Sequence, residues 1–565
     1  MTTARRLPVA WFALVGYALL ALALFFFIWQ APAARWIGSG KDPELFMWYL
    51  GWIPHALTHG QSPLTTDYLS YPAGVNLMWN TSMLFPALVL WPVTAAFGPA
   101  VSYNLLMTSA LALSAWAGFL AARRFIDRSL ASFVAGGLYG FGPGMLAQTF
   151  GHPQTTVALF PPIALILADE ILVRQRLQPL LAGSLAGLAA ALQLLTGEEV
   201  LAVTLLLGVP GVLLLALLHR GRVAEKAPYA LRAVAAAVVV GGAAAAYPLA
   251  VQFLGPQRVF SDVQPRDVYV SDLWAFIVPG HQWLQPDYTL GIVRRFTGNR
   301  TENDAYLGIP LIATFVAGLF VCRRRPPLVW AGLMALLIVL LSMGPHLHIR
   351  GRITGIVLPW DAVARLPLFG NVLPSRLMTI AMLGISLVVA GMLAELWSRG
   401  IAWRAAGVLM LVASVAAIVP ELPYPSHPAG APAFFAAGGD VARLPEGSVV
   451  LVTPFSSKES ADAMYWQTLS GYRFRMPEGD AFTPGPYLGP RPTYLQAALD
   501  RLDRGQPADM SEQSLGRARA DLGALGVQAV VAGPSRGREA IVSFLSAVIG
   551  APPVQTGGVD VWWSV

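Results

Sequence analysis

Residues 38–52 read GSGKDPELFMWYLGW, and this stretch follows closely on an apolar segment at residues 8–30. Pro43 suits the first turn of a helix, where its missing N–H would have no partner in any case. The sequence therefore predicts a helix that starts here with Asp42 as its N-cap, at the positive end of the helix dipole. Asp42 is then either only a cap or a carboxylate at the membrane surface that acts as general base or metal ligand.

The composition of the whole chain places this motif in a membrane protein. Of its 565 residues, 55% are hydrophobic and only 12% are charged, about half the charge of an ordinary soluble domain. This excess of apolar residues argues against a soluble enzyme and a disordered scaffold. The net charge is +7, but the basic residues lie in short groups between apolar segments, which argues against nucleic-acid binding. The single cysteine, Cys322, excludes an intramolecular disulfide and a thiolate metal cluster.

Apolar segments long enough to cross a bilayer recur along the first 420 residues. We expect about eleven transmembrane helices in this polytopic α-helical protein. They lie near residues 8–30, 101–122, 129–147, 154–173, 179–196, 199–219, 229–254, 306–322, 326–344, 375–397 and 401–420. Residues 83–99 are ambiguous, because this segment is short and contains two prolines.

The distribution of basic residues predicts the topology, since short loops rich in Arg and Lys stay in the cytoplasm. The pattern is consistent only if residues 83–99 lie in the interface or re-enter the membrane. The N-terminus is then cytoplasmic and the C-terminus is outside, with outer loops at residues 31–100, 255–305 and 345–374. The inner loops would carry most of the basic residues, including Arg123, Arg124, Arg128, Arg174, Arg176, Arg220, Arg222, Lys226, Arg323, Arg324, Arg325, Arg399 and Arg404.

The sequence after residue 420 changes character. We expect residues 1–420 to form the membrane domain and residues 421–565 to form an extracytoplasmic soluble α/β domain. GSVVLVTPF and VQAVVAG have the pattern of buried strands, and RPTYLQAALDRL and GREAIVSFLSAVIG that of amphipathic helices. VQTGGVDVWWSV, with its central Gly-Gly, predicts a terminal hairpin.

The acidic motif Asp42-Pro43-Glu44 in the first outer loop, right after the first span, resembles the GT-C superfamily of membrane glycosyltransferases. These enzymes are polytopic and take a sugar from a polyprenyl-phosphate donor, or from a diphosphate in the oligosaccharyltransferases. The resemblance covers the chain through about residue 420. It implies that Asp42 removes the proton from the acceptor hydroxyl and that Glu44 orients Asp42 or the acceptor, or binds a metal.

Other polar residues of the outer loops are candidates for the remaining contacts. Arginine suits the donor phosphate because its planar guanidinium can form paired hydrogen bonds, although any single arginine here can equally be an ordinary side chain at headgroup level. The four arginine candidates are Arg376, Arg294, Arg295 and Arg352. The candidates for acceptor or sugar contacts are His152, Glu198, Glu199 and Asp304, for which helix capping and structural hydrogen bonding are the alternatives.

Together these features favour an inverting hexosyl- or pentosyltransferase in a bacterial inner membrane. It would transfer a sugar from a polyprenyl-phosphate donor to an envelope glycan or glycolipid outside the cell. We expect no cofactor; a divalent metal would be compatible with the carboxylates, but no pattern indicates one. Two other functions stay open. A transporter or flippase for lipid-linked saccharides would show charges along the middle of several spans. A non-catalytic assembly protein would tolerate the loss of Asp42.

Overall fold

The computed structural model describes residues 6–259, 264–299, 301–303, 305–455, 461–486 and 488–565. Contacts between residues divide the chain into two compact units. Unit 1 comprises Met1–Gln30, Leu106–Ala245 and Asp262–Pro425, and unit 2 comprises Ala31–Leu105, Ala246–Ser261 and Ser426–Val565. Residues 31–105, which include the predicted first outer loop, thus share a unit with the C-terminal region, whereas the sequence divides the chain at residue 420. The assignment of 1–420 to the membrane and of 421–565 to solvent stays a prediction.

Unit 1 is mostly helical. Its elements are α1 (Arg6–Leu24), α2 (Phe26–Trp29), α6 (Ser129–Gly140), α7 (Pro143–Gln148), α8 (Pro153–Thr156), α9 (Phe160–Asp169) with the π-helical turn η3 (Glu170–Arg174), α10 (Pro179–Leu194), α11 (Glu198–Leu218), α13 (Asp287–Val293), α14 (Gly308–Val321), α15 (Pro326–Ser342), β4 (His346–Ile349), β5 (Arg352–Val357), α16 (Trp360–Ala364), α17 (Leu377–Ser398) and α18 (Ile401–Ile418). Two further helices, α5 (Pro99–Phe125) and α12 (Val223–Leu254), have residues in both units.

Six helical segments of the described residues are long and apolar enough to cross a membrane, judged by length and composition. They are Pro99–Phe125, Pro153–Arg174, Glu198–Leu218, Arg220–Leu254, Pro374–Ser398 and Ile401–Ile418. Shorter apolar helices include Pro8–Leu24, Leu84–Phe97, Pro179–Leu194, Gly308–Val321 and Pro326–Ser342. The expected class, a polytopic helical membrane protein, is confirmed. The count of eleven spans and the treatment of residues 83–99 stay predictions.

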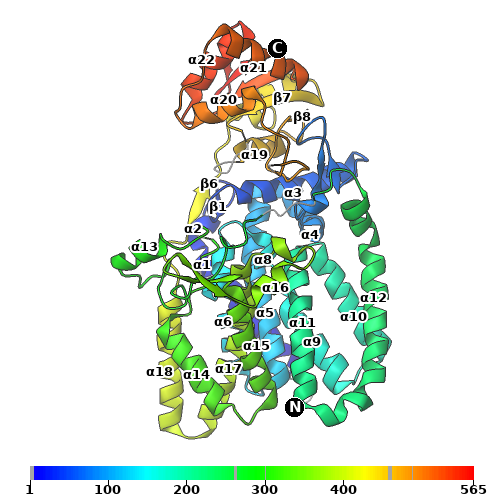
Figure 1. Ribbon diagram of the computed structural model, residues 1–565, viewed down its shortest axis with the longest axis vertical. Coiled ribbons are helices and arrows are strands. Elements are labelled where there is room, and N and C mark those ends of the chain that lie inside the picture. Colours follow the sequence, from blue (N-terminus) through cyan, green and yellow to red (C-terminus); the bar gives the residue numbers. More distant parts are fainter. Residues whose placement is uncertain (1–5, 260–263, 300, 304, 456–460, 487) are drawn as a thin grey trace. The chain divides into compact units, whose positions relative to one another are not determined.

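Helix α17 is the central helix of unit 1. Most of its residues are buried, and it packs against α15, α6, α14 and α18 (Figure 1). Small residues allow this packing: a Cβ at Gly384 would lie 2.6 Å from the carbonyl oxygen of Ala331 in α15. This close approach of small residues is how apolar helices associate where lipid removes the hydrophobic driving force.

Unit 2 combines the first outer loop with a mixed sheet. Its elements are β1 (Arg35–Ile37), α3 (Asp42–Thr58), β2 (Thr65–Thr66), β3 (Val75–Asn76), α4 (Leu84–Phe97), β6 (Ser426–Pro428), β7 (Ser448–Thr453), α19 (Asp462–Leu469), β8 (Phe474–Arg475), α20 (Tyr494–Asp503), α21 (Glu512–Ala524), β9 (Ala529–Ala532), α22 (Arg538–Ile549), β10 (Val554–Thr556) and β11 (Val559–Trp562).

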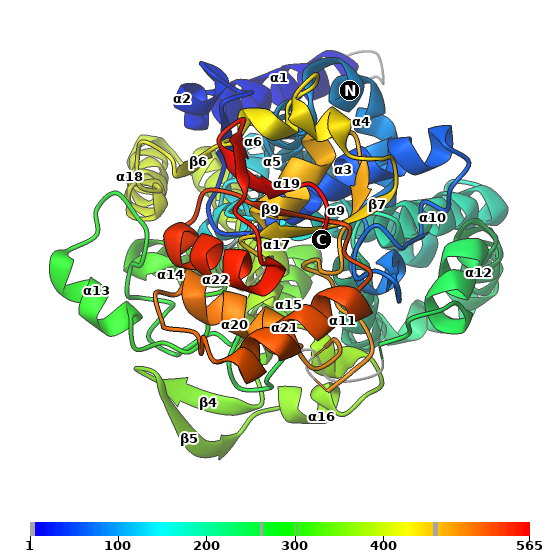
Figure 2. The same ribbon diagram turned by 90° about the horizontal axis from the view of Figure 1, so that it is seen from above.

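The sheet confirms the expected α/β region. Its strand order is β10-β11-β9-β7-β8, with β7 parallel to both β9 and β8. Helices α20, α21 and α22 gather on one side of it (Figure 2) and share its apolar core. The predicted strands β7 and β9, helices α20 and α22, and the hairpin around Gly557 and Gly558 are all present. Helices α19 and α21 were not predicted.

Candidate functional site

The acidic end of helix α3 lies in unit 2. The helix begins at Asp42, with Pro43 in its first turn and Lys41 as the N-cap residue. The predicted helix start is confirmed, but Asp42 is the first helical residue rather than the cap. Its carboxylate still belongs to the first turn, where the helix dipole favours a negative charge.

Glu44, in the first turn of α3, is buried against helix α19. It is 3% exposed, and its Oε2 accepts a hydrogen bond of 2.8 Å from the backbone N–H of Ala461. Burial, together with the charge of Asp462 and a hydrogen bond to it, raises the pKa of Glu44 to about 9. Glu44 is therefore protonated at neutral pH and forms a hydrogen bond with the side chain of Asp462. A buried, neutral acid is suited to positioning α19 on α3 and not to accepting a substrate proton.

Asp42 is more accessible than Glu44, and the charge of Asp480 acts on both carboxylates. It is half-buried, and its neighbour Lys41 donates a hydrogen bond of 2.7 Å from Nζ to Oδ1 of Asp480. Burial raises the pKa of Asp480; Lys41 opposes this shift, and the charge of Asp42 adds to it. Asp42 is thus close enough to Asp480 for the two carboxylates to interact, with the ammonium group of Lys41 beside them.

A second charged cluster lies in unit 1, at the start of helices α11 and α17. The guanidinium of Arg376 donates to Oε1 of Glu302 from Nε at 2.9 Å and from Nη2 at 2.6 Å, and Nη1 donates to Glu199. Glu302 is 3% exposed, and its Oε1 lies 3.5 Å from Nδ1 of His152. Ser375 donates to Oε2 of Glu302 at 3.2 Å. The cluster thus connects four parts of unit 1. These are the residue before α8, the first turn of α11, the segment before α14, and the start of α17.

The charges and hydrogen bonds of this cluster favour the ionised form of Glu302. Burial by itself would raise the pKa of Glu302, but the charges of Arg376 and His152 and the hydrogen bonds from Arg376 and Ser375 outweigh it and hold the pKa below the ordinary value. Glu199 also accepts a hydrogen bond of 3.1 Å from the N–H of Leu373. Arg376 is therefore paired with two carboxylates and offers much less net positive charge than an unpaired arginine would.

The other candidates from the sequence are placed differently. Arg294 and Arg295 follow helix α13, and Arg352 opens strand β5; all three are exposed. Glu198 starts α11 beside Glu199, and His152 immediately precedes α8 and is buried. Asp304 lies outside the described residues. The structure thus brings His152, Glu199 and Arg376 together, with Glu302 at the centre.

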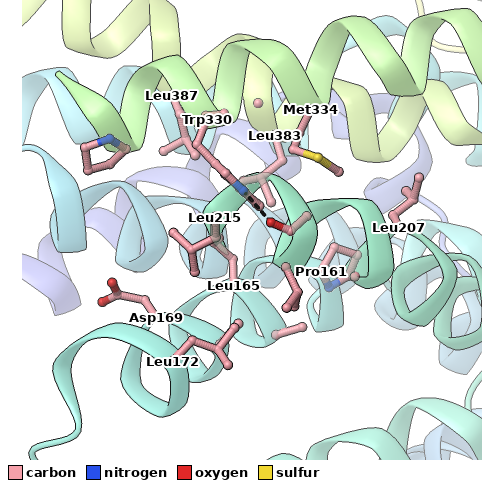
Figure 3. Close-up of a pocket in the computed structure, with 18 of the residues that line it drawn as sticks. Pro161, Leu165, Asp169, Leu172, Leu207, Leu215, Trp330, Met334, Leu383 and Leu387 are labelled. Atoms are coloured by element: carbon pink, nitrogen blue, oxygen red, sulfur yellow. Dashed lines mark hydrogen bonds between the residues drawn. The ribbon is translucent and has the colours of Figure 1, made fainter. Parts of the chain in front are cut away.

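An apolar cavity of about 240 Å³ lies between α9, α11, α15 and α17 in unit 1. Figure 3 shows its lining, with Leu165, Leu215 and Leu383 facing one another from three helices. The lining starts at Ile380, one turn after Arg376, and at Thr204, five residues after Glu199. It runs along α11 to Leu218, a length of roughly 21 Å at 1.5 Å per residue. The cavity therefore begins just below the charged cluster.

Three acids near these sites were missed by the sequence analysis. Glu302 lies in the same TEND stretch as the predicted Asp304, so its position was indicated but its partner, Arg376, was not. Asp462 and Asp480 lie in the C-terminal region, more than 400 residues after α3, and no local pattern marks such a contact. Among the described residues, no group of three or more His, Cys, Asp or Glu side chains is arranged to hold a metal ion.

Comparison with known proteins supplies the fold class. No family model matches the sequence, and no curated protein matches it significantly. The structure is similar to mycobacterial arabinofuranosyltransferase AftD, with a TM-score of 0.58 and 15% identity over 97% of this chain. The chain spans 41% of AftD's length.

Two other solved structures align at lower scores. The oligosaccharyltransferase AglB from Archaeoglobus fulgidus, in complex with an inhibitory peptide and a dolichol-phosphate, gives a TM-score of 0.45 and 11% identity, covering 96% of this chain and 71% of AglB. ArnT from Cupriavidus metallidurans, bound to undecaprenyl phosphate, gives a TM-score of 0.45 and 13% identity, covering 97% of both chains. The expected GT-C fold is confirmed by the likeness to AftD, which at this identity shows the fold alone.

Proposed function

We propose that this chain is a membrane glycosyltransferase that uses a polyprenyl-phosphate sugar as donor and acts on a glycan or glycolipid at the outer face of a bacterial inner membrane. The observation that carries this proposal is the apolar cavity of unit 1, which starts one turn below a buried cluster of charged residues. A lipid with a long apolar chain and an anionic headgroup matches this arrangement, because its charged group lies at one end of its apolar chain. A fold by itself does not define an activity; the cavity and the charged residues are what support this one.

The polyprenyl chain is proposed to occupy the cavity between α9, α11, α15 and α17. Its walls are almost entirely aliphatic and aromatic, with Trp330 held by a hydrogen bond of 2.9 Å from Nε1 to the carbonyl oxygen of Gly211. A buried apolar surface of this kind favours a hydrocarbon ligand over a sugar or a peptide, because a polar group there would lose its hydrogen bonds to water. The headgroup would then lie at the outer end.

Arg376 is proposed to contact the donor phosphate while it keeps its two carboxylates. A guanidinium has five N–H groups, and the hydrogen bonds to Glu199 and Glu302 use three of them. Glu199 and Glu302 fix the plane of the guanidinium, so that little side-chain entropy is lost when it binds. His152, on the other side of Glu302, is proposed to contribute to the same headgroup contacts.

Asp42 is proposed to act as the general base. The acceptor hydroxyl attacks the anomeric carbon of the donor, the bond between that carbon and the phosphate oxygen breaks, and the hydroxyl proton passes to Asp42. The polyprenyl phosphate leaves with the bonding electron pair, and the configuration at the anomeric carbon inverts. Phosphate is already a good leaving group, so this transfer needs charge stabilisation more than an acid. Glu44 is proposed to position α3 rather than to exchange protons with substrate.

The proposal is tested in cells of the strain that produces the protein. Polyprenyl-phosphate sugars and envelope glycans are profiled by mass spectrometry in a deletion strain complemented with wild type, Asp42→Asn or Glu44→Gln. We expect one lipid-linked sugar to accumulate, and its glycan product to disappear, in the deletion strain and with Asp42→Asn, but not with Glu44→Gln. If Asp42→Asn behaves as wild type while the deletion has a defect, the transporter or assembly function takes precedence.

A further inference from the structure

The segment between α15 and α17 carries a two-stranded ribbon, β4 and β5, that the sites described above do not use. The ribbon starts at His346, shortly after α15 ends at Ser342, and α17 follows at Leu377. Both helices are apolar, and α17 belongs to a segment long enough to cross a membrane. The ribbon therefore lies close to the membrane surface, where α15 ends and α17 begins.

The turn of the ribbon is fixed by its backbone and by Asp272. Arg350 and Gly351 form the two-residue turn, with φ of +54° and +78°, and a type I′ turn requires positive φ at both positions. Asp272 accepts from the N–H of Arg350 at 3.1 Å and from that of Gly351 at 2.7 Å. In β4, His348 is fully buried, and its Nδ1 lies 3.2 Å from the hydroxyl oxygen of Thr297. The ribbon is thus attached to unit 1 through β4 and its turn.

Strand β5 is the outer edge of the ribbon and exposes a row of aliphatic side chains. Ile353, Ile356 and Val357 are 55%, 55% and 62% exposed. Leu366 and Leu368, which follow α16, are 47% and 58% exposed. An edge strand of this composition would promote aggregation in water, and a contiguous apolar surface is typical of a contact with a membrane or a partner. We therefore expect this surface to be covered in the native environment.

Basic side chains surround these aliphatic residues. Arg350 and Arg352 are exposed, and Arg365 forms an ion pair with Asp361. Asp361 is the only acid between residues 345 and 374, so this segment carries three arginines against one acid. Two acids of the preceding segment are already bonded, to His346 and to the turn; they are Asp267 and Asp272. The exposed surface of the ribbon is therefore both apolar and positively charged.

The ribbon extends sideways from the helices that it connects. Helices α15 and α17 run roughly along the vertical axis of Figure 1, and in the view from above β4, β5 and α16 lie beyond both of them (Figure 2). The ribbon is therefore placed over the lipid that surrounds these helices. Its backbone has to stay at headgroup level, because the free edge of β5 would lack hydrogen-bond partners in hydrocarbon.

We propose that the ribbon lies in the headgroup region of the bilayer and binds anionic phospholipids. Its aliphatic side chains contact the acyl chains, and Arg350 and Arg352 contact the anionic headgroups. Interfacial protein segments combine apolar and basic side chains in this way, since burial and electrostatic attraction to anionic lipid both favour binding. In the predicted topology the leaflet is the outer one. The proposal does not depend on the proposed transfer reaction.

The test measures the proximity of lipid to two ribbon positions in the full-length protein. Ile353→Cys and Ile356→Cys are labelled with bimane, because the native Cys322 is buried, and each protein is placed in nanodiscs. A fraction of the lipid carries a nitroxide near the headgroup end of its acyl chain, either on phosphatidylcholine or on phosphatidylglycerol. Val412→Cys, on the exposed side of the apolar helix α18, is the positive control. The matched control is Val554→Cys, which is 51% exposed on β10, an edge strand of the C-terminal sheet.

We expect the nitroxide lipids to quench at least one ribbon probe threefold more than the probe at Val554. Labelled phosphatidylglycerol should quench that ribbon probe at least twofold more than the same fraction of labelled phosphatidylcholine. The double variant Arg350→Gln/Arg352→Gln should remove this preference, and so should 1 M NaCl, because salt screens exposed charges.

The proposal is overturned if neither ribbon probe is quenched more than the probe at Val554 while the probe at Val412 is quenched. That result is expected if a protein or a glycan covers the ribbon. Equal quenching of the ribbon probes by the two labelled lipids, or an unchanged preference in the double variant, would also overturn it, because the arginines would then not select anionic headgroups.

Discussion

At the scale of single residues, the two acids of the DPE motif have different environments and therefore different chemistry. Glu44 is buried, protonated and bonded to α19, whereas Asp42 is half-buried at the helix start. Gln in place of Glu44 can donate to Asp462 and accept from Ala461, as the protonated acid does. Asn in place of Asp42 cannot take up a proton. Of these two nearly isosteric changes, Asp42→Asn should therefore abolish activity and Glu44→Gln should preserve it.

The raised pKa of Glu44 makes the stability of the protein depend on pH. Folding keeps Glu44 protonated up to a pKa of about 9, against an ordinary value of 4.5. The stabilisation is complete below pH 4.5 and is lost as the pH rises toward 9, because the unfolded chain releases this proton earlier. The slope is at most about 1.4 kcal/mol per pH unit. Glutamine does not ionise, so the stability of Glu44→Gln lacks this contribution to the pH dependence.

We therefore expect the melting temperature of Glu44→Gln, relative to wild type, to rise steadily between pH 5 and pH 9, as measured by intrinsic fluorescence in detergent. The control is Glu446→Gln, which makes the same chemical change at an exposed loop position and should leave the difference constant. A Glu44→Gln difference that is flat over this range would mean that Glu44 is ionised in the folded protein.

At the scale of secondary-structure elements, the crossing of α3 and α19 depends on Gly51. A Cβ at this position would lie 2.4 Å from the hydroxyl oxygen of Tyr472 and 2.7 Å from Cγ2 of Thr468. Tyr472 donates a hydrogen bond of 2.7 Å to the carbonyl oxygen of Trp48, and Trp48 donates one of 2.6 Å to Gln467. Overpacking of this crossing would disturb both bonds.

Gly51→Ala should therefore destabilise the protein by about 1–3 kcal/mol, seen as a lower melting temperature. Gly516→Ala is the matched control: Gly516 lies inside α21, and a Cβ there meets no described atom within 4 Å. This variant should gain about 0.5–1 kcal/mol, because alanine is the better helix former. A Gly51→Ala variant that melts at or above the wild-type temperature would show that the α3–α19 crossing is not tightly packed.

The cavity of unit 1 can be narrowed from Gly208 of α11. Gly208 lines the cavity, and an added Cβ meets no described atom within 4 Å. If the proposed lipid occupies the cavity, we expect polyprenyl phosphate to copurify with the wild type in native mass spectrometry, and Gly208→Trp to lose at least 80% of it. The matched control is Gly242→Trp on α12, which also has open space but lies outside the cavity lining. Equal lipid content in both variants would place the lipid elsewhere.

At the scale of the whole molecule, periodic and compositional patterns of the sequence predicted the secondary structure well. The same patterns did not predict the long-range contacts. Apolar segments predicted the long apolar helices of unit 1, since each must present a nearly continuous apolar surface, but not its short helices such as α13 and α16. Alternation predicted β7 and β9, and Gly557-Gly558 predicted the terminal hairpin, where both glycines have positive φ. The class of the protein therefore followed from local patterns alone.

The arrangement of the candidate sites could not be predicted in this way. Helix α19 has only eight residues and a weak apolar pattern, and its partner α3 lies some 400 residues earlier. Glu302 and Arg376 form an ion pair across 74 residues, and each would be expected alone to face solvent or a headgroup. Such pairs depend on tertiary packing, which a single sequence does not encode in a local pattern.

The predicted topology can be checked with single cysteines, because the native Cys322 is buried. Ser129 starts α6, in a predicted inner loop, and Gln506 is exposed in the C-terminal region. In intact spheroplasts, a membrane-impermeant maleimide should label Gln506→Cys but not Ser129→Cys, and both should react after lysis. Labelling of Ser129→Cys before lysis would reverse the orientation of the membrane helices.

The central claim, transfer of a sugar from a polyprenyl phosphate, is tested most directly with purified components. The protein in nanodiscs is mixed with the lipid-linked sugars and the acceptor glycans extracted from the deletion strain, and all lipids are quantified by mass spectrometry. We predict that wild type and Glu44→Gln consume one polyprenyl-phosphate sugar and release an equal amount of polyprenyl phosphate, while Asp42→Asn is at least a hundredfold slower. If the wild type consumes no lipid-linked sugar, or if Asp42→Asn consumes it at the wild-type rate, the account is contradicted.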